Sequence, residues 1–514
     1  MIEKYYDGAI EQVAAGLGTV EKNHLLVRYS GQFSVENLND TKQLEKNEDI
    51  FVQVHEFETG EITCAYEPYL TMICDGFRRY MTGTFEEFME TCDVYYLHRP
   101  VLLGYFNQDN TGREEIILLD EVAYEQERMS AALERMLCAI ADRHPVLFVL
   151  NRFQLASKST MQLTARFLKC ENCNIGLVLG VSDIQAMPEF LVPDWEMLYE
   201  TLDDGSKIYH IGNSGRKKEE TIDDEKYVDY GSEKVYRKLQ NMVEFLDFDQ
   251  AAYYLETIER KIKFDNLLVD DAARFRMWLL FVKVSILRQD IPKALEICED
   301  LEKIHLAGKE EECAYEQDYL IATAYMYQGK LKEALEMAGE TYRIAGKMSD
   351  DYRMFLSELL EAKIQMSGWY NIFFCAQDVK IKESLIQNLI RYNYRNHLAH
   401  VYIYAYDNKP EIVKKANQSE ELLIYFSRGI RIAKKLGNEY LINMAYQKNI
   451  MLSSTNGMYE ISLLYSVRTY EALKDKRSIQ AGRIYSGIAY NLCAIGENER
   501  AMAYYRHESV CFII

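Results

Sequence analysis

The chain has 514 residues, which is enough for more than one hydrophobic core, because single cores stop growing at roughly 250 to 300 residues. Hydrophobic residues make up 48% and charged residues 27%, with only 7 prolines, which excludes extensive disorder and favours helix. The formal net charge of −21 argues against direct binding of nucleic acid, since phosphate contacts need clustered Lys and Arg. No apolar run has the length of a membrane span and no signal peptide is recognisable, so we expect a cytoplasmic protein with no membrane partner.

Residues 1–215 are predicted to form an alternating α/β domain. Four short apolar runs, typical of buried parallel strands, occupy residues 23–29, 50–54, 145–150 and 174–180. Between the second and third runs, residues 67–81 and 124–142 are predicted to be helices, because apolar residues such as Met129, Leu133 and Met136 recur at helical spacing. Strands alternating with helices predict a doubly wound parallel sheet.

The third run and its surroundings resemble the Walker B region of STAND-type ATPases, in particular the large LuxR-type regulators. The matching features are a helix that includes Glu127, the proline at 145, an apolar strand, and a further helix near Ser159. The resemblance covers most of the chain in layout but only about forty residues in detail. It implies a P-loop-NTPase-like N-terminal domain followed by tetratricopeptide-like helical repeats.

The departures from that family concern the nucleotide site itself. A working P-loop needs G-x-x-x-x-G-K-[ST], whose amides, lysine and hydroxyl hold phosphates and magnesium. After the first strand this chain has Ser30, Gly31 and Ser34 but no second glycine and no lysine, and Asn151 and Arg152 replace the Walker B acid pair. We therefore predict a degenerate site with no catalytic residues and no cofactor, and keep ATP or ADP binding as an alternative.

Residues 216–232 are predicted to be a linker, because the stretch around them is polar, charged and without apolar periodicity. It is too short for the lid and winged-helix domains of the LuxR-type relatives. Two further motifs give weak metal hypotheses. Cys170 and Cys173 form a lone CxxC, and His397 and His400 lie one turn apart without a third ligand, so no metal is expected.

Residues 233–507 are predicted to form about seven helical pairs of an all-α, tetratricopeptide-like superhelical solenoid. A turn residue followed five positions later by a small residue recurs, and the small residues are Ala251, Ala294, Ala334 and Ala501. The first three are 43 and 40 residues apart, a period typical of two-helix repeats. The later pairs are predicted at 354–368 with 369–379, 392–406 with 420–436, 439–453 with 458–474, and 479–495 with 498–506.

Such arrays bind peptides or proteins on a concave face formed by the first helix of each pair. Polar and aromatic residues on these helices are the candidate partner contacts: Tyr325, Arg353, Asn393, Arg395, His397, Tyr404, Asn443 and Tyr446. With 39 tyrosines in the chain, packing between helices is the competing interpretation for each aromatic residue.

Residues 508–514 are predicted to be an apolar tail, in which Cys511 formally completes a CaaX box without a polybasic neighbour. The leading hypothesis is a non-catalytic regulatory or scaffold protein that binds a peptide or protein on the solenoid. The alternatives are a nucleotide-gated LuxR-like transcriptional regulator, its truncated form without a DNA-binding module, and a functioning ATPase. The sequence predicts no oligomeric state.

Overall fold

The computed structural model describes the chain except for residues 1, 18–23, 30–49, 59–60, 110–111, 114, 119–120, 171–173, 183–186, 204–206, 212–229, 266, 305, 367–382, 405–418, 456, 473–478 and 512–514. It divides into two compact units, which are Met1–Arg113 with Val122–Leu320, and Glu114–Glu121 with Ile321–Ile514. The predicted domain limits at 215 and 216 lie outside the described residues, and the division between the two units falls inside a helix of the repeats.

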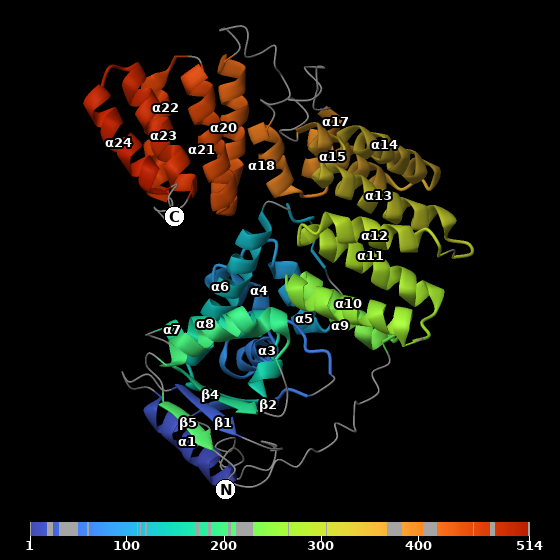
Figure 1. Cartoon of the computed structure of the whole chain (residues 1–514), viewed down its shortest axis with the longest axis vertical. Helices are drawn as coiled ribbons and strands as arrows, with labels where there is room; N and C mark the ends of the chain where they lie inside the picture. The colour runs from blue at the N-terminus through green and yellow to red at the C-terminus, as the bar shows by residue number, and fades with distance from the viewer. Residues whose placement is uncertain are drawn as a thin grey trace. The chain divides into compact units, whose positions relative to one another are not determined.

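The first unit contains a five-stranded parallel sheet with the strand order β2-β3-β4-β1-β5 (Figure 1). The strands are β1 (His24–Tyr29), β2 (Phe51–Glu56), β3 (Val146–Asn151), β4 (Ile175–Ser182) and β5 (Lys207–Ile211). The four predicted strands are confirmed to within two residues at each end. The edge strand β5 is too short and too polar to stand out from the sequence alone.

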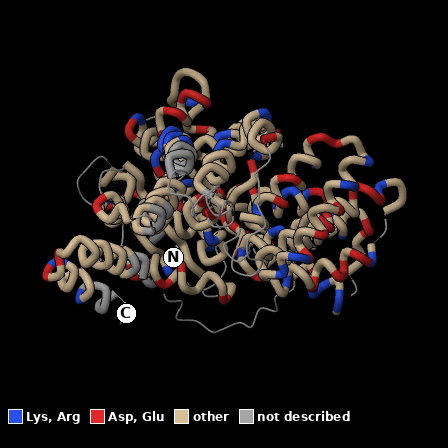
Figure 2. Tube along the Cα trace, turned by 90° about the horizontal axis from the view of Figure 1, so that it is seen from above, with Lys and Arg blue, Asp and Glu red and all other residues tan. Residues whose placement is uncertain are grey.

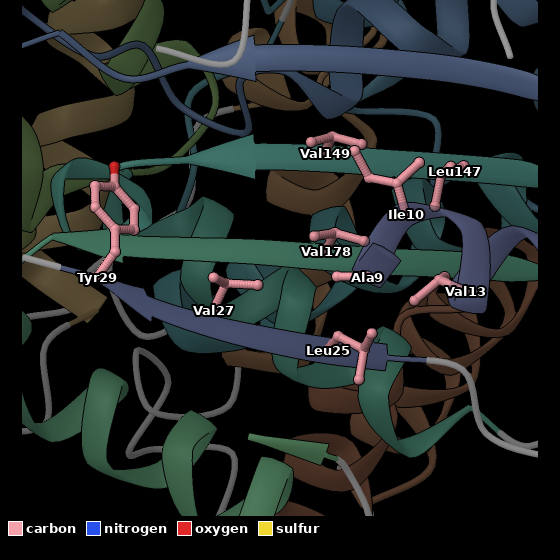
Figure 3. Close-up of a cluster of buried hydrophobic side chains, with 9 residues drawn as sticks. All are labelled: Ala9, Ile10, Val13, Leu25, Val27, Tyr29, Leu147, Val149 and Val178. Carbon is pink, nitrogen blue, oxygen red and sulfur yellow. The ribbon is translucent and has the colours of Figure 1, made fainter. Parts of the chain in front are cut away.

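Helices cover both faces of this sheet. They are α1 (Ile2–Gly16), α3 (Tyr69–Tyr80), α4 (Phe85–Thr91), α5 (Arg99–Asn107), α6 (Val122–Ala141), α7 (Lys158–Lys169) and α8 (Val192–Asp203). Figure 3 shows Ala9, Ile10 and Val13 of α1 above the side chains that β1, β3 and β4 present on one face. On the opposite face Phe148 of β3 meets Tyr69 of α3, with 4.8 Å between ring centroids. The predicted α/β fold class is confirmed, and α3 and α6 correspond to the two predicted helices.

The same unit includes the first helices of the repeats, namely α9 (Glu233–Glu244), α10 (Phe248–Phe264), α11 (Asp271–Leu287) and α12 (Ile291–Leu301). Their contacts with the α/β part are partly polar. The Ser159 amide donates to Asp247 over 3.0 Å, and Lys158 is paired with Asp249. The start of the helical array is therefore fixed to the sheet domain.

Helix α13 (Glu310–Gln328) contains the division between the units, and the remaining helices belong to the second. These are α14 (Leu331–Lys347), α15 (Asp351–Met366), α17 (Glu383–Arg391), α18 (Arg395–Tyr404), α20 (Ser419–Leu436), α21 (Glu439–Thr455), α22 (Tyr459–Ala472), α23 (Ile479–Ala494) and α24 (Asn498–Cys511). The predicted helices agree with α15, α18 and α20 to α24, whereas 369–379 lies outside the described residues. An α/β domain followed by many packed helices, as predicted, is what the structure contains.

At eight helix–helix turns, the residue that ends the preceding helix has left-handed backbone angles. These residues are Leu246, Gln289, Gly329, Ser349, Asn393, Gly437, Gly457 and Gly496, with φ between 54° and 86°. At each turn the amide after this residue bonds a carbonyl five positions back, as in Asp247 to Met242 (2.8 Å) and Lys330 to Tyr325 (2.9 Å). The small residues that follow, Ala251, Ala294, Ala334 and Ala501, are all 0% exposed. The repeating frame seen in the sequence is therefore a helix-capping turn followed by a close helix–helix contact.

Lys and Arg are interspersed with Asp and Glu along the helices (Figure 2). In the described part of the chain, no helix is both long and apolar enough to cross a membrane.

Candidate functional site

The carboxyl edge of the parallel sheet is where a ligand would bind in a fold of this kind. Strands β1, β2 and β3 end there at Tyr29, Glu56 and Asn151. Of the predicted nucleotide-site residues, Ser30, Gly31 and Ser34 lie outside the described residues. Asn151 and Arg152 are described, and they are the last residue of β3 and the residue after it.

Asn151 is completely buried and accepts a hydrogen bond from the Tyr29 hydroxyl, with 2.6 Å between the oxygens. Figure 3 shows Tyr29 at the end of β1 with its hydroxyl turned toward the end of β3. Burial raises the pKa of Tyr29 to about 12, so the phenol is neutral and donates at physiological pH. The Asn151 carbonyl oxygen is thereby engaged by the protein itself.

Arg152, the residue after β3, occupies the left-handed region with φ of 52°. Its Nη2 lies 3.2 Å from Glu56 Oε1 of β2, so this carboxylate and the guanidinium form an ion pair. Magnesium is normally held by carboxylates together with substrate phosphates. An amide bonded to tyrosine and an ion-paired arginine provide no metal ligand of that kind.

Metal binding receives no support elsewhere in the described ranges, which contain no group of three or more His, Cys, Asp or Glu residues able to hold an ion. Of the CxxC pair, Cys170 is half-buried and Cys173 lies outside the described residues.

A buried ionic cluster lies in the first unit. His98 Nε2 is 3.0 Å from Glu125 Oε2, and both side chains are completely buried, while Arg128 pairs with the other oxygen of Glu125. Burial lowers the pKa of His98. Burial opposes ionisation of Glu125, but the hydrogen bond and charge of His98 together with the arginine charges lower its pKa. With no solvent access, this cluster fixes α5 to α6 and offers no site for a substrate.

The predicted partner contacts are dispersed over the array. Tyr325 is half-buried, and its ring centroid lies 5.2 Å from Lys330 Nζ. Arg353 Nη1 donates to Asp350 Oδ2 over 3.2 Å. Asn393 is one of the left-handed turn residues, and its side-chain oxygen accepts from Arg395 Nε over 2.7 Å.

The later candidates lie on α18 and α21. Asn443 and Tyr446 of α21 are half-buried, and the Tyr446 ring lies 5.7 Å from that of Tyr465. The side chain of Tyr404 lies outside the described part. His397 is 1% exposed, and its Nδ1 lies 2.7 Å from Oε1 of Glu115. Burial, and to a smaller extent the Lys363 charge, lowers the pKa of His397 well below its usual range, so the ring is neutral and donates to the carboxylate.

Glu115 belongs to a stretch that the sequence did not single out. The segment Glu114–Glu121, here called the inserted segment, is grouped with the second unit although the chain before and after it belongs to the first. Glu115 and Glu121 are each 1% exposed. Glu121, which follows Asp120 in the sequence, is thus shielded from solvent. The available sequence signal was an apolar run, Ile116 to Leu119, with acidic residues on both sides.

Comparisons with known proteins give structural likeness without a sequence family. No protein-family model matches the chain, and no curated protein matches it. Among solved structures, the chain is similar to a Signal Transduction ATPase with Numerous Domains (STAND) protein with a tetratricopeptide repeat sensor from Pyrococcus horikoshii. The TM-score is 0.44 at 10% identity, and the match covers 94% of this chain and 86% of that one.

Proposed function

We propose that this chain is a non-catalytic regulatory or scaffold protein whose helical repeats bind a peptide segment of a protein partner. The observation that carries the proposal is the seating of Glu115, Leu118 and Glu121 among helices of the second unit. These helices accommodate a non-helical stretch through buried hydrogen bonds and apolar contacts, which is what peptide recognition by a helical array requires.

The sheet edge supports the non-catalytic half of the proposal. Phosphoryl transfer depends on positioned cations and a metal held by carboxylates. Here Asn151 is engaged by Tyr29, and Arg152 by Glu56. The sequence after β1 also lacks the P-loop lysine. Loss at both places removes the charge stabilisation that hydrolysis needs.

One observation favours the alternative of a nucleotide-gated regulator. Open parallel sheets bind their ligands beyond the carboxyl ends of the strands, at the point where the strand order reverses, and β1 lies between β4 and β5 at such a point. That alternative requires affinity for ATP or ADP, and the transcriptional role of LuxR-like proteins would further require a DNA-binding partner.

Site-specific photo-crosslinking in the full chain tests the proposal. A crosslinking amino acid is placed at Arg395 or Tyr446 of the array and, as a matched control, at the exposed Arg143 beyond α6 of the α/β part. We expect protein crosslinks from the two array positions and none above background from position 143. Crosslinks confined to position 143 would contradict partner binding by the repeats.

A further inference from the structure

The inserted segment contacts the second unit like a bound peptide. Residues 115–118 are neither helix nor strand, and the backbone turns at Glu121, whose amide donates to the Leu118 carbonyl over 2.9 Å. Glu115, Leu118 and Glu121 are buried at intervals of three residues. The segment therefore presents a carboxylate, an apolar side chain and a second carboxylate to the helices.

The first carboxylate binds the beginning of α18. Glu115 Oε1 accepts from the His397 amide over 2.7 Å, and Oε2 accepts from the Asn396 amide over 3.2 Å. The amides of a helix's first turn have no partners within the helix and carry partial positive charge, so they favour an anion. Helix α18 has no acidic residue of its own in that turn, and Glu115 supplies the charge.

The second carboxylate binds the beginning of α21. Asn438, which is completely buried, caps this helix by accepting from the Leu441 amide over 3.0 Å. Its Nδ2 donates to both oxygens of Glu121, over 3.0 Å and 3.2 Å. The same amide group also donates to Asn396 Oδ1 over 3.0 Å, which joins the two anchors in one buried network.

Between the anchors, Leu118 enters a core formed by α18, α20 and α21. Its neighbours there are small or aliphatic: Ala399, Ile403, Ala433, Leu441 and Ala445. Three independent features thus define an acceptor surface, which consists of the first turns of α18 and α21 with this apolar site between them.

The charge of the neighbouring helix suits an acidic ligand. Arg428, Arg431, Lys434 and Lys435 of α20 are exposed, and the first three are spaced three residues apart. In the part of the chain that the structure describes, no carboxylate forms an ion pair with any of the four. An acidic segment that approaches this helix meets a run of exposed positive charge, in a chain whose overall charge is strongly negative.

We infer that the inserted segment is a displaceable internal ligand, and that the partner of the array presents the same chemistry. That partner segment carries two carboxylates six residues apart with a leucine-like residue midway. The inference rests on the proposed function and names the ligand class of that site. A tethered segment competes at an effective concentration on the order of millimolar, so a partner binds tightly only when the inserted segment is weakened or released.

The test uses the full chain and a fluorescent peptide of residues 112–122, titrated by anisotropy. The variant E115Q/E121Q weakens the internal ligand and leaves the acceptor surface intact, so it should bind the peptide at least tenfold more tightly than the wild-type chain. A peptide with both glutamates changed to glutamine should lose that affinity. If E115Q/E121Q does not fold, L118A replaces it, since it only shortens the apolar anchor.

The acceptor side is tested by adding N438D to E115Q/E121Q. Aspartate still caps α21, but it replaces the donor to Glu121 with a second negative charge. The addition should reduce peptide affinity at least tenfold. Equal binding to wild type and E115Q/E121Q, or binding insensitive to N438D, would overturn the inference. If the inference fails in this way but photo-crosslinks form from positions 395 and 446, the proposed function still stands. Crosslinks confined to position 143 would contradict the proposed function, whatever the peptide result.

Discussion

Replacing Asn438 with alanine should destabilise α21 more than the loss of an ordinary helix cap does. Loss of the bond to the Leu441 amide costs about 1 kcal/mol, as for other N-caps. Removing Nδ2 also takes a donor from the buried Glu121 carboxylate, which costs about 1–3 kcal/mol more. The expected total is about 2–4 kcal/mol.

Native-state hydrogen exchange of α21 amides is the appropriate assay, because a chain with two units need not unfold in one step. The matched control is D290A at the exposed cap of α12, where Oδ1 accepts from the Lys293 amide over 3.2 Å and the expected loss is about 1 kcal/mol. Adding E121Q to N438A should restore part of the loss, since a neutral amide is less costly to bury. Equal losses in N438A and D290A would refute the proposed role of Glu121.

Three further outcomes are expected. Gly429→Ala should destabilise α20 by about 1–2 kcal/mol, because its Cβ would lie 2.8 Å from the Cγ1 methylene of Ile403 and 3.1 Å from the Ala399 carbonyl oxygen of α18. Gly487→Ala, with open space around it, should instead stabilise α23 by up to about 1 kcal/mol, and hydrogen exchange of each helix measures both changes. Burial holds the pKa of His397 below its usual range in the folded chain, so the unfolded chain binds the proton first, and α18 should lose exchange protection as the pH falls below about 6.5. His397→Asn, whose amide can replace Nδ1, should flatten this pH dependence, and an unchanged slope in this variant would contradict the assigned role of His397. Tyr29→Phe should lower the free energy of unfolding of the sheet unit by about 1 kcal/mol in chemical denaturation, because the hydrogen bond to Asn151 is lost. Crosslinking from the array should not change, and an unchanged stability would argue against that hydrogen bond.

Local patterns made most of the fold predictable. The turn at Gly329 and the small residue Ala334 lie five positions apart, and both act within one helix–helix junction, so their spacing carries over directly into structure. Likewise, β3 and β4 are continuous apolar runs because both faces of the sheet are covered. The sequence also placed Asn151 at the end of its strand.

The inserted segment could not be predicted in this way. Glu115 and His397 are 282 residues apart, and nothing in the local sequence of either specifies the other. An apolar run flanked by acids is compatible with a loop, a helix end or a buried ligand. His397 was proposed as a partner contact because it lies on a first helix of a pair, whereas its actual neighbour is a carboxylate from the other half of the chain.

We propose that this chain acts through its repeats and not through a nucleotide. Isothermal titration of the full chain with ATP or ADP and magnesium, with phosphate release followed in the same samples, tests it most directly. We predict no saturable heat of binding and no release above the background without protein. Saturable binding in the micromolar range would contradict the claim and favour the nucleotide-gated alternative, and phosphate release would establish an ATPase.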